Sequence, residues 1–175
     1  VRRLRAGEPI DLDSAGLHEQ LARVAPLLAE ARSASRLTDC DFVGRRANEA
    51  KHWSSSNASP LAALELAGAW MLEGVVAARA GPMELALEDI EALLRLSDHA
   101  AGSPLQIDLM GAYAVRRDAL AVLAQALPAA SASDLARLKA AWPAPLLPRA
   151  AAALDMEVAW GLSTFGLLGE GYGLV

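Results

Sequence analysis

Three histidines carry the most versatile side-chain chemistry in this sequence, because imidazole serves as an acid, a base and a metal ligand near neutral pH. They are His18, His52 and His99. None has a second histidine or a carboxylate four residues away, which is the spacing of a helical metal site. We therefore predict solvated surface histidines, no metal site and no cofactor, with a metal-binding or acid–base role as the alternative.

The single cysteine is the other reactive side chain. Cys40 stands between Asp39 and Asp41. Two neighbouring carboxylates disfavour the thiolate that a nucleophile needs, so we interpret Cys40 as a core or half-buried residue. A pair formed by Cys40 and His52, which lie in the same stretch, is the alternative.

Sequence motifs of common enzyme classes are missing. The sequence has no G-x-S-x-G elbow, no phosphate-binding loop and no G-x-G-x-x-G that follows a strand. The Gly-rich stretch 169–173 has neither a strand before it nor a helix after it. We therefore predict a protein that is not an enzyme. A hydrolase that uses Glu65, Glu157 or the Cys40–His52 pair is the less favoured hypothesis.

Two charged residues interrupt helical faces that are otherwise apolar. Glu65 shares an arc with apolar side chains, and Arg116 falls between an alanine and a leucine on its helix. Buried charges need partners, so one interpretation is an internal Glu65–Arg116 ion pair. The other is the polar floor of a groove that binds a carboxylate-bearing ligand or a peptide end, with Trp70, Tyr113 and Arg117 at its rim.

Prolines mark the starts of the helices that must position these residues. Ser59-Pro60, Gly81-Pro82 and Ser103-Pro104 each place a capping residue before a proline suited to the first helical turn. Successive prolines are 22 residues apart, so two helices of nearly equal length follow each other with short connections. Short connections make antiparallel neighbours.

The remaining helices are predicted from apolar periodicity and from caps. Asp13 or Ser14 would cap a helix that runs through Leu28, and Ser131 with Asp134 has the spacing of a capping box. We predict a long loop over 36–59 and flexible ends over 1–12 and 169–175. The predicted helices in the rest of the chain cover 60–80, 82–102, 104–127, 131–142 and 148–168.

The apolar patterns also predict which helices are buried. The helix over 60–80 is apolar nearly all round, which predicts the centre of a bundle, and Gly68 would allow a neighbouring backbone to come close. The helix over 82–102 has acidic residues opposite its apolar stripe, which predicts an amphipathic surface helix. The helix over 104–127 carries its apolar stripe on one arc, made of Leu105, Leu109, Ala112, Leu120, Leu123 and Leu127.

Composition sets the fold class and excludes several partners. The 39 alanines and 30 leucines far outnumber the 3 isoleucines, 9 valines and 2 threonines. Helices are therefore favoured over strands, and 175 residues suit a single all-α domain over 1–175 with five or six antiparallel helices. A net charge of −5 gives no reason to expect nucleic acid. Charged residues interrupt the most apolar stretches, so no membrane span is predicted.

The segment from Leu66 to Leu96 has a residue pattern that resembles a tetratricopeptide-type helical hairpin. With the helix that follows, it resembles a family of uncharacterised bacterial proteins, often from envelope or secreted contexts. The resemblance covers 61–127 and implies a helical-repeat-like fold and an envelope or secreted location, with no known activity. It rests on Ala80-Gly81, Glu84, Ala86, Asp89-Ile90 and Leu93-Leu94.

These observations together favour a non-catalytic interaction module that presents a concave helical surface to a peptide or protein partner. The alternative is a binder of a small apolar or carboxylate-bearing ligand in a groove between helices. Because the chain begins at Val1 rather than Met, we expect that a signal peptide, a tag or the upstream part of a larger protein has been removed from it. In a fragment, the face of 150–168 would pair with another copy as a homodimer.

Overall fold

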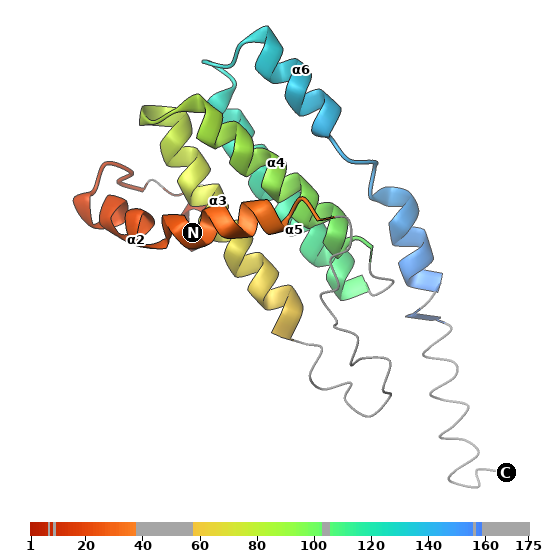
Figure 1. Cartoon of the computed structure of the whole chain (residues 1–175). Helices are drawn as coiled ribbons and strands as arrows, with labels where there is room; N and C mark the ends of the chain where they lie inside the picture. The colour runs from red at the N-terminus through yellow and green to blue at the C-terminus, as the bar shows by residue number, and fades with distance from the viewer. Residues whose placement is uncertain (7, 9, 38–57, 103–105, 156, 159–175) are drawn as a thin grey trace, which may run out of the picture.

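A computed structural model of the chain describes residues 1–6, 8, 10–37, 58–102, 106–155 and 157–158 (Figure 1). This part is helical and contains no strand, which confirms the all-α prediction. A helix over 147–155 follows the six labelled ones, so there are seven helices here against five or six expected. The labelled helices are α1 (Arg2–Arg5), α2 (Ala15–Ala34), α3 (Ala58–Ala80), α4 (Met83–Ala100), α5 (Gln106–Ala126) and α6 (Ala132–Ala141).

Three helices form the centre of the structure. Each of α3, α4 and α5 packs against the other two, and Gly81 and Pro82 join α3 to α4 in a tight turn (Figure 1). The prediction that prolines occupy the first helical turn is confirmed for Pro60 and wrong for Pro82. Pro82 is itself the N-cap of α4, with extended backbone, and Pro60 is the third residue of α3. Ser103 and Pro104 lie outside the described residues.

The helix α4 is the most enclosed of the three, although the sequence predicted a surface helix. It contacts α2, α3, α5 and α6. Its acidic side is covered because arginines of α2 and α6 reach it: Arg32 pairs with Asp89, and Arg137 pairs with Glu84 and Glu91. The acidic residues of α4, which the sequence predicted to face solvent, therefore contribute in part to its interfaces with α2 and α6. The sequence pattern of α4 could not distinguish these two environments.

The predicted apolar arc of α5 is confirmed at Leu109 and Ala112, which are buried, and is wrong toward the end of the helix. Leu120 and Leu127 are 47% and 53% exposed, while Ala119 and Val122 are fully buried. The physical reason is the close approach of the helices, since a Cβ atom added to Gly74 of α3 would lie 2.8 Å from Cγ1 of Val122. At such separations small side chains fit between helices and leucines do not. Side-chain size therefore decided which face of α5 is buried.

The N-terminal helices lie outside the central three (Figure 1). Of the two predicted caps, Ser14 is the one that caps α2, because its hydroxyl accepts a hydrogen bond from the Leu17 backbone N–H, and α2 then runs across α3 and α4. The structure places α1 where a flexible end was expected. Its Arg5 pairs with Asp118 of α5, and the neighbour that approaches Gly68 is Val1.

The C-terminal helices flank α4 on the side away from α2 (Figure 1). The capping box at the start of α6 is confirmed, with Ser131 and Asp134 exchanging side-chain and backbone hydrogen bonds. These hydrogen bonds lower the pKa of Asp134. The predicted helix over 148–168 is described as 147–155 and 157–158, and most of the loop over 36–59 and all of 169–175 lie outside the described residues. No helix in the described ranges is long and apolar enough to cross a membrane.

Candidate functional site

The five residues predicted from the sequence to line a groove have different environments. Glu65 is exposed on α3, and Tyr113 and Arg117 are exposed on α5. Trp70 is 0% exposed, and its indole N–H donates to the carbonyl oxygen of Leu28 at 3.3 Å. Burial therefore rules out a place for Trp70 at the rim of a groove, while the binding role of the others stays a prediction.

The Glu65–Arg116 ion pair is not among the ion pairs of the described residues. Arg116 instead donates to the carbonyl oxygen of Ala144 at 3.1 Å, in the segment between α6 and the helix over 147–155. Burial lowers the pKa of Arg116, and the charge of Asp98 opposes that effect. The internal pair was wrong because Glu65 is exposed and Arg116 is directed toward Ala144, and the helical period alone determines neither orientation.

Buried ion pairs do occur, at positions that the sequence did not single out. Arg32 of α2 places Nη1 2.5 Å from Oε2 of Glu73 and 2.5 Å from Oδ1 of Asp89. We call these three side chains the Arg32 cluster. Arg5 likewise pairs with the buried Asp118. The acidic residues on α3, α4 and α5 were the feature of the sequence that could have indicated these pairs. Their arginine partners lie 41 to 113 residues away in the sequence, so the pattern of a single helix does not identify them.

The Arg32 cluster contains two carboxylates and one cation. Asp89 is fully buried, and its Oδ2 has no hydrogen-bond partner. Burial, together with the charge of Glu73, raises the pKa of Asp89 to about 8 despite the attraction of Arg32. At neutral pH Asp89 is therefore mainly protonated, and the cluster as a whole is close to electrically neutral.

This protonation predicts a pH-dependent stability. Asp89 takes up a proton on folding, because its pKa in the unfolded chain is near the ordinary value of about 4. The resulting stabilisation is complete below that value and is lost as the pH rises through about 8. We expect the free energy of unfolding, measured in urea, to fall by about 1.4 kcal/mol from this group between about pH 7 and about pH 9. Asp89→Asn should lack this decrease, and an unchanged pH profile would contradict the assignment.

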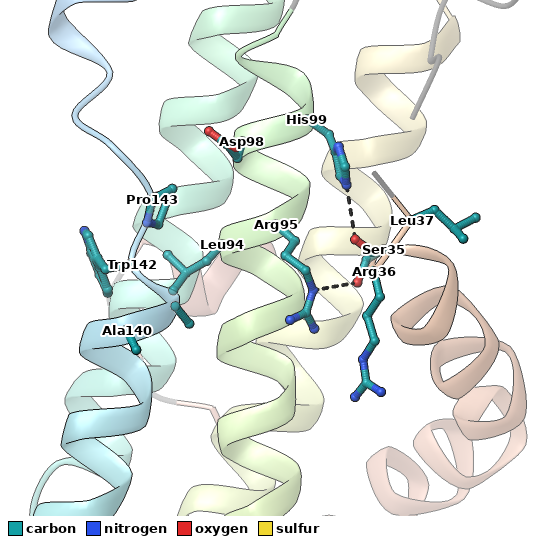
Figure 2. Close-up of a pocket in the computed structure, with 11 residues that line it drawn as sticks. Ser35, Arg36, Leu37, Leu94, Arg95, Asp98, His99, Ala140, Trp142 and Pro143 are labelled. Carbon is teal, nitrogen blue, oxygen red and sulfur yellow. Dashed lines mark hydrogen bonds between the residues drawn. The ribbon is translucent and has the colours of Figure 1, made fainter. Parts of the chain in front are cut away.

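A groove lies over the outer side of α4, between the end of α2 and the end of α6 (Figure 2). Leu94, Arg95, Asp98 and His99 of α4 form its floor. Residues 35–37 form one wall and residues 140–143, which include Trp142, form the other. Its volume is about 340 Å³. We call it the α4 groove. The sequence pattern could not identify it because its three parts are more than 40 residues apart.

Polar contacts tie the α2 wall to the floor. The Nε atom of Arg95 donates to the hydroxyl of Ser35 at 3.2 Å, and Nε2 of His99 donates to the carbonyl oxygen of Ser35 at 3.1 Å (Figure 2). His99 is thus half-buried and hydrogen-bonded, where a solvated histidine was predicted, and His18 is exposed as predicted. The end of α2 is therefore held at a defined distance from α4.

Arg95 has an incomplete set of partners in the α4 groove. Its Nη2 is buried without a hydrogen-bond partner, and its Nη1 lies 3.6 Å from Oε2 of Glu91. Burial lowers the pKa of Arg95, and the nearby charge of Arg36 acts in the same direction. A buried donor without an acceptor is costly, so this position favours an incoming anion.

Apolar surface accompanies these charges. Trp142 is 37% exposed, and Leu37 is an exposed leucine on the opposite wall. The walls thus combine apolar side chains with the polar Ser35 and Arg36, and mixed apolar and polar linings also occur in ligand-binding pockets. Cys40 and His52 lie outside the described residues, and within those residues no group of three His, Cys, Asp or Glu could hold a metal ion.

The sequence matches no known protein-family model, and neither the curated proteins nor the solved structures give a match.

Proposed function

We propose that this protein is a non-catalytic interaction module and that the α4 groove binds a segment of a peptide or protein partner. The observation that carries the proposal is the buried, unpartnered Nη2 of Arg95 in a groove whose walls expose Trp142 and Leu37. A binding partner would supply the missing acceptor and cover the apolar walls at the same time.

The positions of the groove residues support recognition by preformed surfaces. The floor belongs to α4, which is packed against four other helices. Hydrogen bonds from Arg95 and His99 fix the α2 wall. A preformed site loses little conformational entropy on binding, which favours affinity. In this proposal α3 and α4 act as a tetratricopeptide-like hairpin that presents its outer surface.

A small carboxylate-bearing ligand is the second candidate for the same groove. The volume of about 340 Å³ favours it, because this value is at the lower end of the roughly 300–1,000 Å³ found for small-molecule pockets. The homodimer also stays a proposal. Leu154 and Val158, on the face expected to pair, are exposed, and most of that segment lies outside the described residues.

The test uses a pool of short random peptides offered to the immobilised protein, with the retained peptides identified by mass spectrometry. We expect retention by the wild type and a loss of roughly tenfold or more by Trp142→Ala, since truncation of a central aromatic contact typically costs over 1 kcal/mol. Leu135→Ala is the matched control, because Leu135 is similarly exposed on α6 and does not line the groove. Equal retention by all three proteins would contradict the proposed site.

A further inference from the structure

The α4 groove carries positive charge in a protein whose net charge is −5. We propose that the α4 groove recognises the free carboxyl terminus of its peptide partner, with Arg95 and Arg36 binding the terminal carboxylate. The inference rests on the proposed function and names the chemical group that the groove selects. It follows from three features: the incomplete pairing of Arg95, the position of Arg36, and the small size of the groove.

Arg95 shares its acidic neighbour with another arginine. Oε1 of Glu91 lies 2.5 Å from Nε of Arg137, whereas Oε2 lies 3.6 Å from Nη1 of Arg95. Glu91 therefore interacts mainly with Arg137 of α6. Arg95 keeps only the longer contact of 3.6 Å to this carboxylate, and its Nη2 has no acceptor. Arginine binds a carboxylate through two parallel hydrogen bonds, so a ligand carboxylate fits this requirement.

Arg36 supplies a second cation from the opposite wall. It is exposed at the end of α2 and lines the same groove as Arg95. The charges of Arg36 and Arg95 repel each other, which is one cause of the lowered pKa of Arg95. An anion that binds near both guanidinium groups would relieve this repulsion.

Asp98 limits the charge that the groove accepts. It also lines the groove, and Oδ1 of Asp98 is 3.0 Å from Nη1 of Arg149. A dianionic phosphate would face this carboxylate, whereas a carboxylate with one negative charge would be repelled less. The groove therefore favours a monoanion over a phosphate group.

The size of the groove favours a chain end. A volume of about 340 Å³ is enough for the last few atoms of a peptide chain and its terminal side chain. A terminal residue also carries its side chain next to its carboxylate. The carboxylate would meet Arg95 and Arg36 while the side chain contacts Leu94 and Trp142, which lie beside Arg95 on the floor and on the α6 wall (Figure 2).

The experiment compares two pools of short random peptides that differ only at the C-terminus, one with a free carboxylate and one with a carboxamide. We expect the wild type to retain the free-acid pool at least about tenfold more strongly, since hydrogen bonds to charged groups contribute about 1.5–3 kcal/mol. Arg95→Gln should lose this preference, and thermal unfolding would verify that the variant is folded. Arg23→Gln, at an exposed position of α2 outside the groove, should keep it.

Three other outcomes would overturn the inference in distinguishable ways. Equal retention of both peptide pools by the wild type, with loss of retention in Trp142→Ala, would show that the groove does not recognise the carboxyl terminus. The proposed function would then stay intact. Preference for peptides with internal Asp or Glu, in both pools alike, would assign the groove to side-chain carboxylates. Retention of neither pool would remove both the inference and the peptide-binding function.

Discussion

Replacement of Arg32 by methionine is expected to lower the free energy of unfolding by about 3–5 kcal/mol, the cost of breaking a buried ion pair. Arg32 is the cation that both Glu73 and Asp89 contact, and both acids are buried. Without it, Glu73 and Asp89 face each other between α3 and α4 with no opposing charge. Their ionised forms are then strongly disfavoured.

The measurement is urea unfolding at neutral pH, with Arg23→Met as the control because Arg23 is exposed on the same helix. The control should change the stability by less than about 0.5 kcal/mol. The triple variant Arg32→Met, Glu73→Leu, Asp89→Leu should recover most of the loss, since apolar replacement of a whole buried ion cluster is often neutral. A loss below about 1 kcal/mol for Arg32→Met would show that the cluster is solvated.

The Trp70→Ala substitution is expected to cost about 3–5 kcal/mol of stability, as large-to-small changes of buried aromatic residues do. Trp70 is fully buried in the core formed around α3 and α4. Its loss would open a cavity and also leave the carbonyl oxygen of Leu28 without its indole donor. The effect should therefore include weaker attachment of α2, visible as faster amide hydrogen exchange in Ala15–Ala34.

Trp142→Ala is the matched comparison for stability, since Trp142 is a partly exposed tryptophan at the end of α6. It should change the free energy of unfolding by less than about 1 kcal/mol. Trp70→Phe should fall between the two, because the ring volume is largely kept and the hydrogen bond is lost. Similar small losses for Trp70→Ala and Trp142→Ala would instead place Trp70 at the surface, as the rim of a groove requires.

The α4 groove was beyond prediction from the sequence for a specific reason. Arg36 fell in a predicted loop, Arg95 on a predicted surface helix and Trp142 at a helix end. Each of these residues has an ordinary explanation when considered alone. The groove exists only because α2 and α6 both pack against α4, and the contacts that hold them are made by single arginines rather than by a recurring pattern.

The sequence by itself determined most of the helices of this protein, although it did not predict α1. Alanine and leucine content fixed the helical class, Ser14 and Ser131 fixed the starts of α2 and α6, and the short turn at Gly81 paired α3 with α4. These features depend on contacts within a few residues, which the order of residues specifies directly.

Only the tertiary structure decided how those helices face one another. Whether Leu120 or Val122 of α5 is buried depends on the close approach of α3 at Gly74, and which acids are solvated depends on where Arg5 and Arg32 reach. The physical reason is that shape complementarity and charge pairing act between residues that are distant in the chain. The helical periodicity of a sequence indicates that a helix has an apolar face, but packing against the neighbouring helices decides which residues are buried.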